Sequence, residues 1–321
     1  MSKKTPRYDR ELREMLGSSP DIRRTPLRAE EIPELREQFR SPGTEALRVG
    51  RDIDIHDNVI LARDGAKLTA TTLAKRGSTH PRGALFHIHS GGMIAGDRLI
   101  GMELMADWVE AEDVICASVD YRLAPEHPDP TPLNDCYDAF TSFADETSAK
   151  FGDIPLVVVG MSAGGGLAAG LALLSRDLHG PQLSGQLLMC PMLDEANDTP
   201  SSHQFSELGL WDRESNETGW NALLGSRRHT DSVRQYASPS LAEDLSGLPP
   251  TYLDVGALEV FRSEVVDYAE RLATSDVSVE LHLWAGAFHG FDLAFPTARV
   301  SQLAISSRKM WLERLLEGSL S

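Results

Sequence analysis

The sequence has few cysteines and few basic residues for its length. Its three cysteines, Cys116, Cys136 and Cys190, are too sparse and odd in number to form a disulfide framework. Lysine and arginine number 31 against 48 aspartates and glutamates, so the net charge is −17. Because this charge repels phosphate backbones and gives no basic patch for anionic lipid, we expect neither a nucleic-acid nor a membrane partner.

Long apolar runs are also missing. No stretch of about 18 consecutive apolar residues occurs, so a membrane-spanning helix is not expected. Residues 1–16 are rich in charge and differ from a signal peptide. Together with the sparse cysteines, these features predict a cytoplasmic protein. The cysteines and histidines do not cluster at the spacing of a zinc site, so no metal is expected.

Apolar residues near the start of the chain recur at helical spacing. Leu12, Met15 and Leu16 form one such set. Two interpretations stay open: amphipathic helices that rest on a core, or part of a lid over a pocket. We therefore separate an N-terminal helical cap segment, residues 1–45, from the remainder of the chain, residues 46–321.

The middle and end of the sequence alternate between short apolar runs and longer helical stretches. Runs this apolar are typical of strands buried on both faces, which parallel sheets require. The alternation predicts an α/β fold with a mostly parallel central sheet and helices on both faces. Two further runs, 59–62 and 67–74, flank Asp64-Gly65 and predict a hairpin. The apolar runs are 84–89, 114–119, 156–160, 186–190, 251–255 and 279–284, and a long amphipathic helix is expected over 297–316.

One long interval interrupts this alternation. Residues 195–237 contain no strand pattern but carry bulky aromatics, including Trp211 and Trp220. In α/β sheets, ligands bind outside the carboxyl ends of the strands. An insertion that follows a strand at this end is therefore expected to form a cap over the binding crevice.

The strongest chemical signal is the pentapeptide from Gly160 to Gly164, Gly-Met-Ser-Ala-Gly. It follows the apolar run 156–160 and precedes a helical run of small residues. This is the strand–turn–helix context of a nucleophile elbow, in which strained backbone presents a serine hydroxyl at the top of a sheet. The pattern makes Ser162 the candidate nucleophile.

Two loops supply candidate partners for this serine. The loop His89-Ser90-Gly91-Gly92 follows an apolar run, and backbone N–H groups exposed by glycines there can bind a developing oxyanion. His289 lies on the loop after the last apolar run, C-terminal to Ser162, which is the chain order of α/β-hydrolase triads. His289 is therefore the candidate base.

The acid of such a triad is expected between the serine and the histidine. Asp254 and Glu259 are the candidates, with Glu264 one turn further on. Asp254 lies within the predicted strand 251–255, whereas Glu259 lies on the segment that follows it. Because the serine and histidine loops emerge at the carboxyl end of the sheet, Glu259 is favoured.

Three longer segments, together with the elbow, carry a family resemblance. They are DYRLAPEHPDPTPLNDCYDAF (120–140), PSLAEDLSGLPPTYLDVGALEVFRSE (239–264) and GAFHGFD (286–292). The chain resembles the bacterial hormone-sensitive-lipase-like carboxylesterases, also called family IV, from about residue 30 onward. The resemblance implies an α/β-hydrolase fold in which residues 46–321 form the catalytic domain with a cap insertion at about 195–237.

The resemblance also implies roles for single residues. Ser162 matches the family's nucleophile and His289 its base, while Glu259 stands where the family usually has aspartate. The N–H groups of Gly91, Gly92 and Ala163 match the oxyanion hole.

Three positions depart from the family pattern. Ser90 replaces the first glycine of the oxyanion loop, and Met161 replaces an aspartate beside the nucleophile. Glu259 in place of aspartate adds one methylene, which α/β-hydrolase triads accept.

The sequence therefore predicts a serine carboxylesterase that hydrolyses short-chain carboxylic esters through an acyl-enzyme intermediate. It needs neither metal nor cofactor, and its partner is a small-molecule ester. The resemblance implies acyl chains of roughly two to six carbons, and no large apolar stretch suggests a lipid-facing groove. Two alternatives remain: an amidase or thioesterase on the same scaffold, or a non-catalytic ligand-binding protein of the same fold. Members of the family often form a homodimer through the edge of the last strand, which the sequence neither supports nor excludes.

Overall fold

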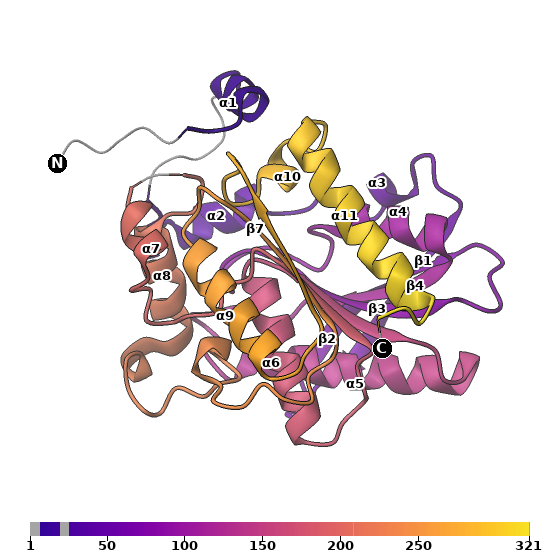
Figure 1. Ribbon diagram of the computed structural model, residues 1–321. Coiled ribbons are helices and arrows are strands. Elements are labelled where there is room, and N and C mark those ends of the chain that lie inside the picture. Colours follow the sequence, from indigo (N-terminus) through magenta and orange to yellow (C-terminus); the bar gives the residue numbers. More distant parts are fainter. Residues whose placement is uncertain (1–6, 20–25, 208, 321) are drawn as a thin grey trace.

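A single eight-stranded sheet forms the centre of the protein (Figure 1). The computed structural model describes residues 7–19, 26–207 and 209–320. The strands lie in the order β1-β2-β4-β3-β5-β6-β7-β8; β2 pairs antiparallel with β1 and β4, and all other neighbours pair in parallel. The strands are β1 (Ile53–Leu61), β2 (Lys67–Lys75), β3 (Gly83–Ile88), β4 (Val114–Val119), β5 (Leu156–Met161), β6 (Gly185–Met189), β7 (Thr251–Gly256) and β8 (Val279–Trp284).

Helices cover both faces of this sheet. In Figure 1, α4 and α11 lie against one face, and α5, α6 and α9 against the other. The α-helices are α1 (Arg10–Gly17), α2 (Ile32–Gln38), α3 (Glu45–Arg48), α4 (Met102–Glu112), α5 (Thr131–Phe151), α6 (Ala163–Asp177), α7 (Pro200–Gln204), α8 (Arg213–Leu224), α9 (Arg262–Thr274), α10 (Phe291–Ala294) and α11 (Arg299–Leu316). This arrangement is the α/β fold that the sequence predicts, and the prediction is confirmed.

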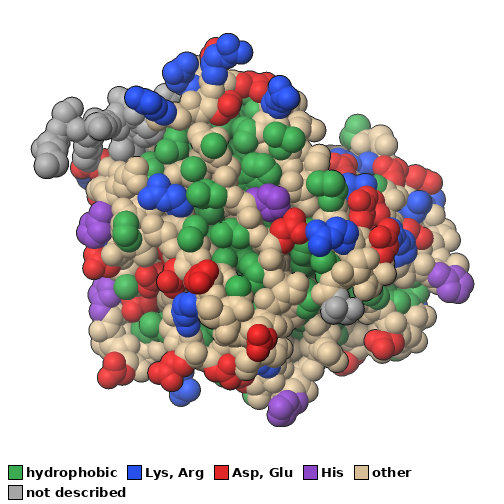
Figure 2. Space-filling model, viewed as in Figure 1, with side chains coloured by type: hydrophobic (Ala, Val, Ile, Leu, Met, Phe, Trp, Pro, Cys, Tyr) green, Lys and Arg blue, Asp and Glu red, His purple; other side chains and the backbone are tan. Residues whose placement is uncertain are grey.

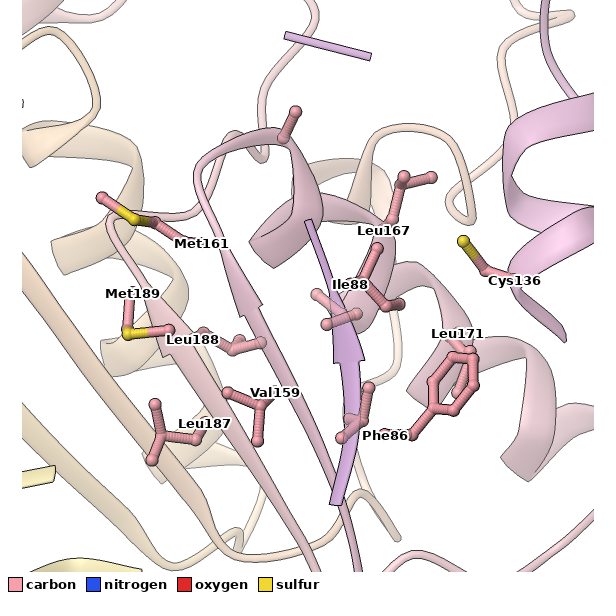
Figure 3. Packing of buried hydrophobic residues seen from close by; sticks show 14 of the residues in the cluster. Phe86, Ile88, Cys136, Val159, Met161, Leu167, Leu171, Leu187, Leu188 and Met189 are labelled. Carbon is pink, nitrogen blue, oxygen red and sulfur yellow. The ribbon is translucent and has the colours of Figure 1, made fainter. Parts of the chain in front are cut away.

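The core lies between the sheet and its helices. Every residue of β3, β4, β5, β6 and β7 is buried. Figure 3 shows Phe86 and Ile88 of β3 with Leu167 and Leu171 of α6 packed against them, and Val159 of the neighbouring strand β5. Because each buried aliphatic or aromatic side chain stabilises the fold by about 1.5–3 kcal/mol, these strands hold the segments that follow them in place.

The apolar runs predict six of the strands correctly, each to within one residue at either end. β1 is longer than the predicted run 59–62, because it begins at Ile53. The difference has a physical cause: β1 is an edge strand with one face open to solvent, so polar residues alternate along it and break the apolar pattern.

β8 forms the other edge of the sheet. Its side chains Leu281 and Leu283 are 38% and 49% exposed. Figure 2 shows hydrophobic side chains gathered on this face of the molecule.

Among the described residues, no helix is both long and apolar enough to cross a bilayer.

Candidate active site

Ser162 lies in the sharp turn between β5 and α6. Its φ is +56°, and its N–H donates to the carbonyl of Met189 in β6 at 2.8 Å. The flanking glycines are required by close packing. A Cβ at Gly160 would lie 2.1 Å from the carbonyl oxygen of Gly164, and one at Gly164 would lie 2.1 Å from that of Ile88. The Gly-x-Ser-x-Gly pattern therefore reports a backbone too crowded for side chains on either side of the serine.

The structure brings His289 to this serine. The Ser162 Oγ and His289 Nε2 atoms are 2.9 Å apart. The imidazole is held edge-on against the Phe261 ring, with centroids 5.0 Å apart. Only 11% of the His289 side chain is exposed, so the pair is largely shielded from water.

A small apolar cluster supports the loop that carries His289. Phe288 beside it packs with Phe291 and Phe295, and Leu12 and Leu16 of α1 cover them. The N–H of Asp9 donates to the carbonyl of Gly286 at 2.9 Å, which ties the start of α1 to the same loop. The N-terminal segment thus stabilises the position of the histidine.

Glu259 lies on the opposite side of the imidazole. Its Oε1 is 3.2 Å from His289 Nδ1, and its Oε2 accepts a hydrogen bond from the N–H of Gly256 at 3.3 Å. The side chain is almost fully buried, and burial raises the pKa of this carboxyl, while the neighbouring His289 opposes the rise. Ser162, His289 and Glu259 therefore form one hydrogen-bonded chain.

Asp254, the alternative acid, has different partners. Its carboxylate accepts from Arg308 Nε at 2.7 Å and from the Trp284 indole at 3.2 Å. Arg308 also pairs with Asp292, and all three charged groups are buried. The two carboxylates raise the pKa of the Arg308 guanidinium well above its usual range, against the opposing effect of burial. Asp254 thus anchors α11 to β7, and no bond joins it to His289 among the described residues.

Two histidines at the end of β3, His87 and His89, are excluded as bases by burial. Burial lowers the pKa of His87 to about 3, and its Nδ1 lies 3.1 Å from Ser118 Oγ. Burial also lowers the pKa of His89, whose ring stacks on Tyr121 at 4.1 Å. Both side chains are part of the core.

The predicted oxyanion donors follow two neighbouring parallel strands, β3 and β5, at the same edge of the sheet. Gly91 and Gly92 have φ values of +122° and +65°, and Ala163 is the first residue of α6. Within the described part of the chain, no carbonyl or side chain accepts a hydrogen bond from the N–H of Gly91, Gly92 or Ala163. These N–H groups are therefore free for a ligand, as the N–H groups at the start of a helix commonly are.

A cavity of about 460 Å³ opens at Ser162. Its volume is within the range of small-molecule sites. His289 is the one titratable group among the described residues that line it, so the cavity suits an uncharged ligand. The lining residues are Leu27, Leu35, Gln38, Phe39, Ser90, Gly91, Gly92, Met161, Ser162, Leu210, Trp211, Ser215, His289, Gly290, Leu293 and Ala294.

Two of the residues that depart from the family pattern line this cavity. Met161 is 8% exposed, and a Cβ at Gly290 would lie 3.7 Å from its Cε, so the methionine packs beside the histidine loop. Ser90 precedes the oxyanion glycines, and its carbonyl lies 2.8 Å from His89 Nδ1.

Sequence reasoning left one part of the wall undecided, because it kept both a core role and a lid role open for the N-terminal helices. Leu27 from the N-terminal segment, and Leu35 and Phe39 at α2, reach the cavity from far away in the chain. Their helical spacing indicates an apolar face but not what that face covers. Of the two tryptophans in the insertion 195–237, Trp211 lines the cavity, whereas Trp220 is fully buried in the main core.

Three groups at the site could in principle hold a metal. Potential ligand atoms of Cys190, Glu259 and His289 lie within 4.8 Å of one another. However, burial raises the pKa of the Cys190 thiol well above its usual range, and a protonated thiol is a poor ligand. Both nitrogens of His289 already face Glu259 and Ser162. The geometry thus favours proton transfer over metal binding.

A second cavity, of about 640 Å³, lies at the other end of the sheet, where β5, β6 and β7 begin. Its serines bond to backbone: Ser175 Oγ donates to the carbonyl of Pro181 at 2.8 Å, and Ser184 Oγ accepts from the N–H of Leu156 at 3.3 Å. Neither serine therefore has a histidine base.

An α/β hydrolase is defined by a mostly parallel sheet that carries a strained serine at a strand-to-helix turn. The acid and then the histidine follow this serine in chain order, each on a loop after a later strand. Residues 85–293 match a family model described as alpha/beta hydrolase fold, and the chain belongs to this family. The resemblance to the hormone-sensitive-lipase-like carboxylesterases is thereby confirmed.

Relatives and solved structures agree with this membership. The chain is 34% identical over 220 residues to the carboxylesterase NlhH of Mycobacterium tuberculosis, covering 66% of this chain and 68% of NlhH. It is 30% identical to esterase LipI of the same organism, covering 64% of this chain and 65% of LipI, slightly less than two thirds. A bacterial heroin esterase structure superposes with a TM-score of 0.88 at 31% identity, covering 98% of both chains. Esterase LipW from Mycobacterium marinum gives a TM-score of 0.85 at 30% identity, covering 98% of this chain and 99% of LipW.

Proposed function

We propose that Ser162, His289 and Glu259 form the catalytic triad of a serine carboxylesterase that acts on short-chain esters. The chain is a carboxylic ester hydrolase by its relatives. The observation that carries the triad is the continuous chain of contacts from Ser162 Oγ through the His289 imidazole to the Glu259 carboxylate, at 2.9 and 3.2 Å.

The mechanism follows from these contacts. His289 Nε2 takes the proton of Ser162 Oγ as the oxygen attacks the ester carbonyl. Glu259 accepts a hydrogen bond from Nδ1–H, which selects the tautomer with a free Nε2 and stabilises the imidazolium that forms. Because Glu259 is buried, its carboxylate has few competing partners, and this favours a fixed ring orientation.

Charge on the tetrahedral intermediate is stabilised by backbone. The N–H groups of Gly91, Gly92 and Ala163 are proposed to bind the oxyanion, and loss of one such donor typically costs about 3–4 kcal/mol of barrier. His289 then protonates the leaving alcohol. Water then attacks the acyl-enzyme. His289 takes the proton of this water and returns a proton to Ser162 Oγ as the acid product leaves.

We further propose that the N-terminal segment and the insertion together form the cap of this site. Leu35 and Phe39 at α2 and Trp211 in the insertion 195–237 line the cavity above Ser162. Arg36 fastens α2 in place: its Nε donates to the carbonyl of Ile94 at 2.7 Å, just beyond the oxyanion loop. Residues 1–45 and 46–321 are therefore consecutive parts of the chain that contribute to one site, and not two independent sites.

Activity is expected to fall on acidification. Once the His289 imidazole carries a proton it can no longer accept one from Ser162, so we expect the rate to fall as the assay is taken from about pH 8 down to about pH 5. A kcat/KM profile with a soluble butyrate ester measures this. A rate that stays flat over that range, with chemistry shown to be rate-limiting, would exclude a histidine base.

The acyl preference gives the direct test of the substrate class. A mostly apolar cavity of about 460 Å³ at Ser162 has a size suited to soluble small-molecule esters rather than to triglyceride emulsions. We expect kcat/KM over a graded acyl series to peak at roughly two to six carbons, the range that the resemblance to the hormone-sensitive-lipase-like carboxylesterases implies. A matched anilide and a matched thioester in the same assay distinguish amidase and thioesterase activity. Faster turnover of long-chain emulsions than of soluble butyrate esters would contradict the proposal.

A cytoplasmic location and a homodimer stay predictions. The edge position of β8 and its exposed Leu281 and Leu283 are compatible with strand-edge pairing between two copies. Sedimentation of the purified protein measures the oligomeric state.

A further inference from the structure

We infer that Trp211 is the specificity-determining residue that limits the length of the acyl chain, and that Leu293 borders the alcohol group instead. The inference rests on the proposed ester hydrolysis and assigns the two parts of the substrate to two walls of the same cavity. Both side chains line the cavity at Ser162.

Trp211 lies directly against the oxyanion loop. A Cβ at Gly92 would lie 2.6 Å from Trp211 Cη2 and 3.0 Å from its Cζ2. On α8, a Cβ at Gly219 would lie 3.5 Å from the same Cζ2 and 3.2 Å from the carbonyl oxygen of Gly92. The six-membered ring therefore fills space that the missing side chains of two glycines leave open.

The ring is also held in a fixed position. Its indole nitrogen donates to Asn216 Oδ1 at 3.3 Å, and Asn216 Nδ2 in turn donates to Asn197 Oδ1 at 3.0 Å. Both asparagines are fully buried. Because buried polar groups that find partners are costly to displace, this network keeps the indole against Gly92 rather than letting it swing away.

The geometry of the reaction assigns the two walls. The tetrahedral carbon on Ser162 Oγ carries three other groups: the oxyanion, the leaving alcohol and the acyl chain. The oxyanion points to the N–H groups of the Gly91-Gly92 loop, and the alcohol oxygen must lie near His289 Nε2 to receive its proton.

The alcohol group therefore extends along the wall that follows His289 in the chain. That wall consists of Gly290 and of α10, which contributes Leu293 and Ala294. The acyl chain takes the remaining direction, away from His289. There the cavity is bounded by Trp211, beside the oxyanion loop, and by the N-terminal residues Leu27 and Leu35. Trp211 is the largest of these side chains and so determines how far an acyl chain can extend.

The experiment compares two substrate series on two variants. One series lengthens the acyl group from butyrate to decanoate on a constant alcohol; the other lengthens the alcohol on a constant butyrate. We expect Trp211→Ala to raise the decanoate-to-butyrate ratio of kcat/KM by about tenfold or more, since methylene fit in an apolar pocket discriminates on this scale. The ratio within the alcohol series should change by less than about twofold, well inside that scale. For Leu293→Ala we expect the reverse: the ratio within the alcohol series should rise, and the decanoate-to-butyrate ratio should change by less than about twofold.

Ratios taken within one variant cancel any difference in folded fraction. If Trp211→Ala yields no soluble protein, Trp211→Leu removes most of the ring while keeping an apolar side chain, and the same ratios apply. Trp211→Phe, which retains a smaller ring, should raise the decanoate-to-butyrate ratio less than Trp211→Ala does and should leave the alcohol ratio close to wild type.

A shift in the alcohol series with Trp211→Ala, or unchanged ratios in both series, would overturn the assignment of the walls. Failure of the proposed function has a separate signature: the wild-type protein would hydrolyse no ester of either series, or Ser162→Ala would hydrolyse them equally well.

Discussion

Replacing Ser162 with alanine is expected to lower kcat for a soluble butyrate ester by about 10⁶-fold, the loss seen when a comparable triad serine is removed. The reason is that the acyl-enzyme route needs an oxygen on this side chain, and no other serine lies within hydrogen-bond distance of His289 among the described residues. The residual rate would come from the oxyanion donors and substrate binding alone.

The fold should survive this change. Among the described residues, the Ser162 side chain has one hydrogen-bond partner, His289. The turn is held instead by backbone bonds from the N–H groups of Gly166 and Met192 to the Ser162 carbonyl, each 3.0 Å long. Alanine accepts the same backbone with no larger side chain. Thermal unfolding measured by circular dichroism therefore should not change. Ser142→Ala on the exposed side of α5 is the matched control and should keep wild-type activity. Comparable loss of rate in both variants would argue against a special role for Ser162.

Replacing Glu259 with glutamine is expected to lower kcat by about 10⁴-fold, as a neutralised triad acid does elsewhere. Glutamine has nearly the shape of glutamate but can present its amide N–H to His289, which favours the tautomer with the proton on Nε2. In that tautomer the nitrogen facing Ser162 cannot accept its proton. Because Glu259 interacts with His289 and the Gly256 N–H rather than with a buried cation, the melting temperature should change little.

Asp254→Asn is the matched contrast. It neutralises one of the two carboxylates that face the buried Arg308 guanidinium. Breaking a buried ion pair costs about 3–5 kcal/mol, so the melting temperature should fall by roughly 10 °C in a chain of this size. The folded fraction should retain most of its kcat. If instead Asp254→Asn abolished turnover and Glu259→Gln did not, the two acids would have to exchange roles.

The parts of the fold that were predictable are those with local signals. β3, β4 and β5 consist mostly of apolar residues, and this pattern is visible without tertiary information. The same holds for Ser162 and His289, because a motif or a place at the end of the last strand identifies them. For the proposed acid, position along the chain favoured the carboxylate that lies beside His289: Glu259 follows β7, whereas Asp254 lies within the strand.

The walls of the cavity were not predictable, because they depend on contacts between distant segments. Leu27 and Trp211 are far apart in sequence, and neither carries a signal that distinguishes a pocket wall from a core face. Trp220 shows the consequence: it has the same size as Trp211 and lies on the next helix, yet it packs into the core. The partner of Asp254 was equally hidden, since Arg308 is 54 positions away on α11.

Covalent labelling with an organophosphonate tests the central claim, that Ser162 is the nucleophile, most directly. Such a reagent reacts with an activated serine and stays attached, so peptide mapping by mass spectrometry locates the modified residue. We expect one label per chain, on the peptide that contains Ser162, with ester hydrolysis lost in proportion to labelling and no label on Ser162→Ala. A label on any other serine, or full labelling at Ser162 with hydrolysis unimpaired, would contradict the account.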